Sequence, residues 1–224
     1  MNTSSGDRDY ASPPCFMHEL ASGAQAADAD HWPDVRRWRK AARERLIAER
    51  LAVPAKTRSE LAEDIANKLD RLIGDPAGRV IGLYWPFRGE PDLRPWLARC
   101  AARGAETALP VVIEKGAPLV FRPYRPGDTL ERGVWNIPVP ATQAEIAPDI
   151  VVSPLVGFDA ARYRLGYGGG YYDRTLAALA KKPLVVGIGY AFSQLPTIYP
   201  QPHDIAMDHI MTAGEKILPS GVPA

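Results

Sequence analysis

Short apolar segments alternate with amphipathic segments along most of this chain, and no other feature restricts the possible fold as strongly. Residues that favour strands dominate six short runs, at 79–85, 106–113, 118–124, 150–156, 184–188 and 209–212. Apolar residues at helical spacing predict helices over 34–51, 57–73, 93–102 and 171–180. Strands that alternate with helices predict an α/β fold, a single domain with a mostly parallel sheet flanked by helices on both faces. Such sheets bind their ligands at the carboxyl ends of the strands.

Two of the predicted strands carry a further signal about their place in the sheet. The run at 150–156 is almost wholly apolar, as expected of a strand buried on both faces. Pro110 interrupts the run at 106–113. Because proline lacks the N–H group that a β-ladder needs, we expect an interrupted ladder or an edge position at this residue.

The first predicted helix, 34–51, is dense in arginine. Its apolar residues at helical spacing are Val35, Trp38, Ala42, Leu46 and Ile47. We expect cations around its other faces, at Arg36, Arg39, Lys40 and Arg43. A run of this kind is either a solvated basic face or part of an anion site, and the sequence leaves both interpretations open.

The overall charge argues against a polyanionic partner. The 27 Lys and Arg residues nearly cancel the 26 Asp and Glu residues, so the basic excess that is typical of nucleic-acid binders is absent. No apolar run approaches the roughly 20 residues that span a bilayer. We therefore expect small-molecule ligands, no nucleic acid and no membrane, and a monomer or weak homodimer.

The segment before the first helix reads differently from the rest of the chain. Residues 1–33 are rich in Ala, Ser, Asp and Gly, and we interpret them as a flexible tail before a domain at 34–218. They lack the basic start and apolar stretch of a secretory signal. The two cysteines, Cys15 and Cys100, do not suggest a disulfide framework. Together these features predict a cytoplasmic protein.

The most informative segment is RLGYGGGYYDR, residues 164–174, between the buried strand at 150–156 and the helix at 171–180. Glycine permits positive φ and leaves room for a close ligand, and successive N–H groups next to a helix N-terminus can converge on a phosphate. The alternative is a tight strand-to-helix turn without a ligand. The segment combines four glycines with an arginine, paired tyrosines and an aspartate, which favours a binding loop. It is neither a Walker A loop nor a dinucleotide fingerprint.

The same segment resembles the signature of the 5-formyltetrahydrofolate cyclo-ligase (methenyltetrahydrofolate synthetase) family. The resemblance continues through SPLVGFDAARYRLG at 153–166, WNIP at 135–138, RGEPDLRPWL at 88–97 and HDIAMDHIMT at 203–212. It spans roughly residues 34–215, in the family's order. It implies a NagB/RpiA-like three-layer sandwich. It also implies an ATP-dependent closure of 5-formyltetrahydrofolate to the 5,10-methenyl form, with ADP and phosphate as the other products.

The resemblance also implies roles for individual residues. Arg164, Tyr172 and Asp173 would be catalytic. A further set would bind ATP: Arg39, Lys40 or Arg43 from the first helix, with Arg164, Gly166, Gly168, Gly169, Gly170, Tyr171 and Tyr172. The folate would contact Glu90, Trp135, Tyr171 and Tyr172. Helix-capping by Glu90 and a core position for Trp135 are the structural alternatives.

Mg²⁺, with ATP as co-substrate, is the implied cofactor. Asp173 and Asp204 would hold it directly or through water, with Asp208 behind them. A zinc site at His203 and His209 is the poorer alternative, because its spacing matches no common zinc pattern.

Two positions depart from the family's pattern. Tyr167 stands where relatives often carry a second arginine, and Gly169 where some have lysine. The phosphate site would then carry less charge, so that nucleotide affinity is weaker or the first helix contributes more. A folate- or nucleotide-binding relative without turnover, and ATP-dependent activation of a different formyl or amide substrate, are the alternative functions.

Overall fold

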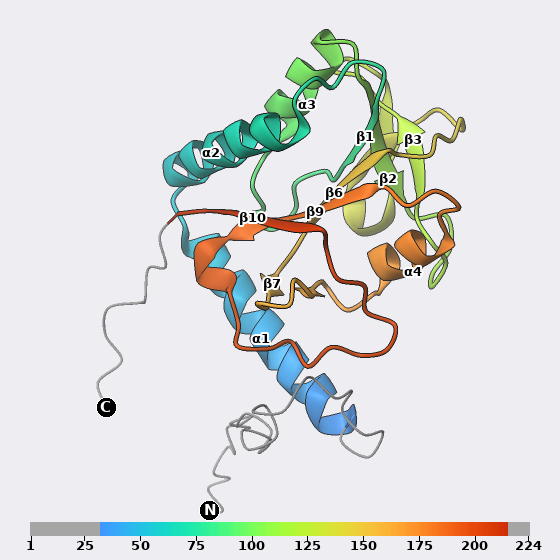
Figure 1. Cartoon of the computed structure of the whole chain (residues 1–224). Helices are drawn as coiled ribbons and strands as arrows, with labels where there is room; N and C mark the ends of the chain where they lie inside the picture. Colours follow the sequence, from blue (N-terminus) through green and yellow to red (C-terminus); the bar gives the residue numbers. More distant parts are fainter. Residues whose placement is uncertain (1–31, 215–224) are drawn as a thin grey trace, which may run out of the picture.

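The computed structural model describes residues 32–214, and within them four α-helices surround a six-stranded sheet (Figure 1). The helices are α1 (Trp32–Ala52), α2 (Ala55–Ile73), α3 (Arg94–Ala102) and α4 (Tyr171–Ala178). In spatial order the strands are β10 (His209–Ala213), β9 (Leu184–Tyr190), β6 (Ile150–Pro154), β1 (Val80–Leu83), β2 (Glu106–Val111) and β3 (Val120–Pro123).

Short elements complete the chain. Two small hairpins lie outside the main sheet: β4 (Leu130–Arg132) with β5 (Pro138–Pro140), and β7 (Gly157–Phe158) with β8 (Arg164–Leu165). Single 3₁₀ turns lie at η2 (Val134–Asn136) and η3 (Ala191–Ser193). These elements were not predicted, because segments of two or three residues are too short to show a period.

The sheet is parallel except for β3, which confirms the predicted mostly parallel sheet. The apolar strand β6 lies in its interior between β9 and β1 and is buried on both faces. At Pro110, β2 pairs only with β3, because its register with β1 ends at Ala108. The proline thus lies where one side of the ladder has stopped, in agreement with the predicted interruption.

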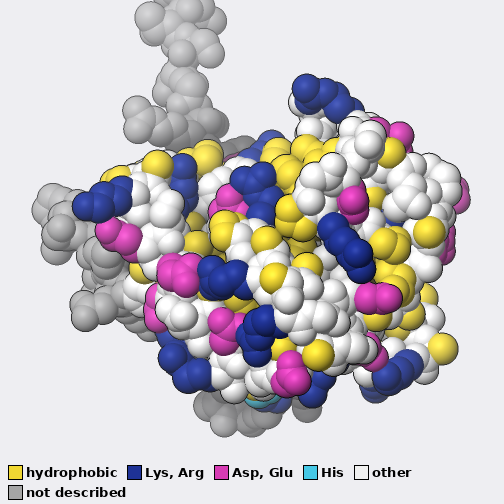
Figure 2. Space-filling view, turned by 90° about the horizontal axis from the view of Figure 1, so that it is seen from above, with side chains coloured by type: hydrophobic (Ala, Val, Ile, Leu, Met, Phe, Trp, Pro, Cys, Tyr) yellow, Lys and Arg dark blue, Asp and Glu magenta, His cyan; other side chains and the backbone are white. Residues whose placement is uncertain are grey.

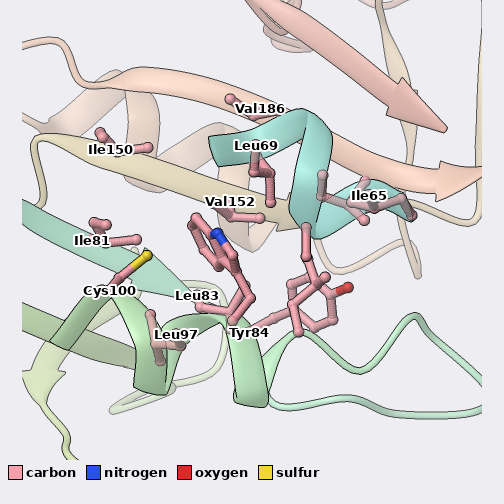
Figure 3. Packing of buried hydrophobic residues seen from close by; sticks show 14 of the residues in the cluster. Ile65, Leu69, Ile81, Leu83, Tyr84, Leu97, Cys100, Ile150, Val152 and Val186 are labelled. Carbon is pink, nitrogen blue, oxygen red and sulfur yellow. The ribbon is translucent and has the colours of Figure 1, made fainter. Parts of the chain in front are cut away.

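Helices cover both faces, so the sheet is the middle of three layers. In Figure 1, α2 and α3 lie above the sheet and α4 lies beneath it. The larger core cluster is on the α2–α3 side, where Leu69 and Leu97 meet Leu83, Val152 and Val186 of three adjacent strands (Figure 3). A second cluster on the opposite face joins residues of α4 to β2, β6 and β9. Burial of these apolar faces provides the main driving force for this arrangement.

The outer surface of α2 and α3 carries charges of both signs. Figure 2, which looks down on this face, shows Lys and Arg side chains interspersed with Asp and Glu. Several of them form ion pairs, such as Arg99 with Glu63 and Arg103 with Asp70. Along the described part of the chain, no helix is long and apolar enough to cross a membrane.

Helix α1 corrects two predictions. It begins at Trp32, so the last two residues of the predicted tail are helical; residues 1–31 and 215–218 of the predicted tail and domain lie outside the described part. Its buried side is formed by Val35, Arg39, Ala42, Leu46 and Arg50. The prediction that Arg39 lies on an outer, polar face is therefore wrong.

Candidate active site

A cavity of about 510 Å³ opens at the carboxyl ends of β1, β2 and β6. Its walls come from the segments that follow these strands, from the loop between β8 and α4, and from one side of α1. Fourteen of the residues predicted for the site line this one cavity: Arg39, Lys40, Arg43, Glu90, Trp135, Arg164, Gly166, Gly168, Gly169, Gly170, Tyr171, Tyr172, Asp173 and Asp204. The structure brings them together from positions up to 165 residues apart in the chain. Their individual roles stay predictions.

The loop between β8 and α4 needs glycine for reasons of geometry. Gly168 has a φ of +94° and Gly170 a φ of +63°, both in the left-handed region that other residues rarely adopt. At Gly169, an added Cβ would lie 2.7 Å from Cε2 of Tyr171. Gly170 is the N-cap of α4, and the first turn of this helix has N–H groups without intrahelical partners. The loop and the helix start therefore line the cavity with a backbone that is suited to binding an anion.

Arg164 and Asp173 hold the two ends of this loop together. Nη2 of Arg164 lies 2.8 Å from Oδ2 of Asp173, and Oδ1 of Asp173 accepts a hydrogen bond from the N–H of Ile205 at 3.2 Å. The guanidinium also lies over the Tyr172 ring, 5.0 Å from its centroid. The Nε of Arg164 and the hydroxyl of Tyr172 are buried without a hydrogen-bond partner among the described residues. Because buried polar groups are normally paired and both side chains line the cavity, a ligand bound there could pair with these two atoms.

Helix α1 contributes three cationic side chains to the cavity lining, and they differ in their contacts and exposure. Arg39 is committed to protein contacts, since it donates to the carbonyls of Ile198 and Tyr199 and pairs with Asp204 at 2.5 Å. Arg43 donates its Nε to the carbonyl of Gly166 at 2.7 Å, and its guanidinium lies beside Gly168. Lys40 is exposed. The sequence could not separate these three; the structure leaves Arg43 and Lys40 as the better phosphate ligands.

Burial and the nearby Arg39 charge lower the pKa of Arg43, with Asp204 opposing the shift. Two guanidinium groups of like charge are thus held close together at the loop. Such an arrangement is relieved by an anionic ligand, because the ligand's charge offsets the repulsion.

The carboxylates predicted to hold Mg²⁺ are both paired with arginine. Asp173 pairs with Arg164, and Oδ2 of Asp204 accepts from Arg39 and from the N–H of Gln201. Between residues 32 and 214 no group of three or more acidic, His or Cys side chains forms a metal cluster, and this also leaves the zinc alternative without support. Oδ1 of Asp204 lies 3.9 Å from His203 Nε2, and among the described residues it is the one oxygen of these two carboxylates that accepts no hydrogen bond, which leaves it free for a hard cation such as Mg²⁺. Two carboxylates suit a metal ion that takes its remaining oxygen ligands from a phosphate group.

Asp208 does not belong to this group. Its Oδ2 accepts a hydrogen bond from the N–H of Val185, where β9 begins, and it does not line the cavity. His209, at the start of β10, also lies outside the cavity lining. The expected place of Asp208 behind the metal ligands stays a prediction that these contacts do not support, since the irregular segment from Asp204 to Asp208 carries its carboxylate to the start of β9.

Glu90 lines the same cavity, and only 5% of it is exposed. Its Oε2 accepts from the N–H of Phe87 at 2.8 Å, and its Oε1 accepts from the Tyr167 hydroxyl at 2.7 Å. Burial raises the pKa of Glu90 to about 7, although Arg50, Tyr167 and the Phe87 amide lower it. These contacts differ from helix capping, the structural alternative for this residue. A buried carboxylate of this kind can accept paired hydrogen bonds from a ligand.

Trp135 lies at the cavity mouth. It occupies η2 at the tip of the β4–β5 hairpin, is 56% exposed and has a φ of +56°. Its ring stands edge-on to Tyr171, with the ring centroids 6.2 Å apart. The alternative that Trp135 is a core aromatic is therefore wrong. With Tyr171 it offers flat apolar surface for an aromatic ligand.

The sequence analysis missed Arg50. This side chain, 3% exposed, donates to the Arg88 and Leu155 carbonyls and to the Tyr167 hydroxyl. A signal was present, because Arg39 and Arg50 fall at helical spacing on the same stripe as Ala42 and Leu46. Charged residues on an otherwise apolar stripe are rarely buried without a partner, so they mark an internal polar network.

Comparison with known proteins agrees with this site. The model of the 5-formyltetrahydrofolate cyclo-ligase family matches residues 35–213. The 5-formyltetrahydrofolate cyclo-ligase of Mycolicibacterium smegmatis is 33% identical over 175 residues, which cover 75% of this chain and 89% of that protein.

Two solved structures share the fold, each with 25% sequence identity. The 5,10-methenyltetrahydrofolate synthetase of Aquifex aeolicus has a TM-score of 0.68 and covers 83% of this chain and 96% of its own. The enzyme of the same name from Mycoplasma pneumoniae has a TM-score of 0.63, with 77% and 96% covered. The family match spans the six strands and all four glycines of the loop. This chain belongs to the 5-formyltetrahydrofolate cyclo-ligase family.

Proposed function

We propose that this protein converts 5-formyltetrahydrofolate to 5,10-methenyltetrahydrofolate, with ATP hydrolysed to ADP and phosphate. The observation that carries the proposal is the single cavity that joins a glycine-lined anion site to a buried carboxylate and an aromatic mouth. Phosphoryl transfer between two substrates requires both to lie in one space, with their reacting atoms in contact. Family membership supplies the reaction, and the cavity supplies a place for each substrate.

The phosphates of ATP would lie on the β8–α4 loop. Backbone N–H groups of the lining residues 166–170 and of the first turn of α4 would donate to them, and Arg43 and Lys40 would add positive charge from α1. Arg164 would contribute its unpaired Nε. The weaker charge caused by Tyr167 and Gly169 is offset in this arrangement by the cations of α1.

The pterin would lie at the Glu90 end. Ionised Glu90 can accept two hydrogen bonds from the amino-pyrimidinone edge, and the unpaired hydroxyl of Tyr172 offers a further polar contact. Burial keeps Tyr172 neutral by raising its pKa. The aminobenzoyl group would pass Tyr171 and Trp135 toward the mouth.

The chemistry needs positioning more than a protein nucleophile. The formyl oxygen attacks the γ-phosphorus and ADP leaves, which gives an iminium phosphate at N5. N10 then attacks the same carbon, loses its proton, and phosphate leaves to form the methenyl bridge. Arg164, Arg43 and the loop amides would neutralise the charge that moves onto the phosphate oxygens.

Mg²⁺ would neutralise charge on the ATP phosphates, with Asp204 Oδ1 as its nearest protein oxygen and Asp173 reachable once Arg164 turns to the phosphate. This assignment predicts that a chelator abolishes turnover. It also predicts that Asp204→Asn raises the Mg²⁺ concentration needed for half-maximal rate, while folate binding measured without nucleotide is unchanged.

The decisive test mixes the purified protein with 5-formyltetrahydrofolate, ATP and Mg²⁺ and follows the methenyl chromophore. The proposal predicts one methenyl product and one ADP for each formyl group consumed. Folate and ATP binding without product would instead favour a binding relative without turnover. ADP release with other formyl compounds and not with the folate would indicate a different substrate.

A further inference from the structure

Tyr167 connects two parts of the cavity that are distant in the chain. Its backbone lies in the glycine loop between Gly166 and Gly168, and its hydroxyl donates to Glu90 Oε1 at 2.7 Å, across a sequence separation of 77 residues. The side chain that replaces the family's second arginine therefore points toward the carboxylate and away from the phosphate side of the loop.

Arg50 completes this contact from helix α1. Its Nη2 donates to the Tyr167 hydroxyl, its Nη1 lies 4.0 Å from Glu90 Oε1, and its guanidinium lies 5.7 Å from the Tyr167 ring centroid. Arg50 is fixed in turn by the carbonyls of Arg88 and Leu155. The Tyr167 hydroxyl accepts from one side and donates to the other, so both of its neighbours set its orientation.

Two members of this network, Arg50 and Glu90, are almost completely shielded from solvent. Arg50 is 3% exposed and Glu90 is 5% exposed. A hydrogen bond to a charged group is stronger and more directional in such surroundings than at a surface. If the loop moved and carried the Tyr167 hydroxyl away, the buried Glu90 carboxylate would lose a hydrogen-bond donor. The free-energy cost of that loss would fall on the site where the pterin is expected.

We propose that Tyr167 and Arg50 are positioning residues that hold Glu90 ready for the folate, and that Tyr167 couples nucleotide binding on the glycine loop to folate binding at Glu90. The inference rests on the proposed function, because it assumes a phosphate on the loop and a pterin at the carboxylate. Closure of the loop amides on a phosphate fixes the Tyr167 backbone, and the hydroxyl then orders Glu90. Because such coupling is reciprocal, each ligand tightens the other by the same factor.

The pH dependence of folate binding gives a second measure of the network. The groups around Glu90 that bear charge or titrate are Arg50, Tyr84, Tyr167, Tyr172 and Tyr190. Folate affinity should rise as the pH increases through the pKa of Glu90, because the ionised form accepts the pterin hydrogen bonds. Loss of the Tyr167 hydrogen bond raises this pKa, so the midpoint should move upward by about one pH unit.

The experiment measures binding of 5-formyltetrahydrofolate by calorimetry, from pH 5.5 to 8.5, with and without Mg²⁺ and a non-hydrolysable ATP analogue. We expect the analogue to tighten folate binding in the unaltered protein by roughly fivefold or more. Tyr167→Phe should weaken folate binding about tenfold, shift the midpoint upward and reduce the effect of the analogue to near onefold. Glu90→Gln should remove the pH dependence.

Tyr163→Phe is the matched control. It removes a hydroxyl four residues earlier, from a half-buried ring outside the cavity lining, and should leave affinity, midpoint and coupling unchanged. The inference is overturned if the unaltered protein shows no effect of the analogue, or if Tyr167→Phe keeps that effect. Absence of the methenyl product would contradict the proposed function instead, since calorimetry reads the coupling without turnover.

Discussion

The buried carboxylate of Glu90 shapes the pH behaviour of the whole protein at the residue scale. Its ordinary pKa is 4.5, and burial raises it to about 7 in the folded chain. Between these two values the unfolded chain holds fewer protons than the folded chain. Stability therefore falls as the pH rises through this window, and the loss is complete above pH 7.

We predict that Glu90→Gln changes this slope. In the absence of ligands, the unaltered protein should lose about 2.5 kcal/mol more stability than the variant between pH 5 and pH 8. Urea unfolding at the two pH values measures the difference. Equal slopes for the two proteins would show that Glu90 titrates normally. In activity, the variant should have a raised KM for folate and a KM for ATP that changes less.

Gly169→Val tests the glycine loop. The added side chain would begin 2.7 Å from the Tyr171 ring, and displacement of that ring would disturb the loop beside it. We predict a loss of nucleotide affinity of tenfold or more with the melting temperature nearly unchanged, since Gly169 is exposed.

Gly166→Ala is the comparison, because its Cβ would meet nothing closer than 3.5 Å and should have a milder effect. Nucleotide titration measures both variants. Unchanged affinity in Gly169→Val would mean that the loop is only a turn.

At the residue scale, the sequence predicted which residues line the cavity, but not which hydrogen bonds and ion pairs they form. The resemblance to the family, carried by the glycine motif and four further segments, predicted 14 residues that the structure brings to one cavity. It could not predict that Arg39 is committed to Asp204, or that Tyr167 points to Glu90. These contacts are set by rotamers and by packing between distant segments, which leave no local pattern.

At the element scale, α1 is more than a basic helix on the surface. Its inner side carries Arg39 and Arg50, which reach the loop before Asp204 and the segment after β1. The helix thus connects two walls of the cavity. The helical period of α1 was predicted correctly, but Arg39 was assigned to the wrong face. Hydrophobic periodicity identifies buried apolar residues and does not identify buried charged residues.

The ion pair between Arg39 and Asp204 gives a prediction for this helix. The two side chains are 8% and 10% exposed. Arg39→Met should cost roughly 3 kcal/mol of unfolding free energy, because Asp204 would be left buried without its partner. Arg39→Met with Asp204→Asn should recover part of this loss.

Arg37→Met is the matched control on the same helix, since Arg37 pairs with Asp34 at the surface with side-chain exposures of 76% and 47%. It should cost less than about 1 kcal/mol. Chemical unfolding of the unaltered protein and of these three variants measures the differences. Equal losses for Arg39→Met and Arg37→Met would contradict a structural role for the buried pair.

At the scale of the whole molecule, the order of strands places the site. The parallel strands β1, β2 and β6 all end at the same edge of the sheet, and the segments that follow them form the cavity walls. The alternation of strands and helices predicted this edge from the sequence. The strand β3 was predicted, but its antiparallel direction and the small hairpins were not, since pairing direction and short strands depend on contacts across the fold.

The family match begins at residue 35. We therefore predict that deletion of residues 1–30 leaves kcat, both KM values and the melting temperature within about twofold and 2 °C of the unaltered protein. Steady-state kinetics and thermal unfolding test this. A deletion that abolishes folate binding would show that the active unit extends further toward the N-terminus.

The most direct test of the account is the crystal structure of the protein with Mg²⁺, a non-hydrolysable ATP analogue and 5-formyltetrahydrofolate. We predict the triphosphate on the amides of 166–170, the pterin edge on Glu90, and the formyl oxygen within about 3.5 Å of the γ-phosphorus. A triphosphate bound elsewhere, or a pterin that does not reach Glu90, would contradict the claim that this one cavity holds both substrates.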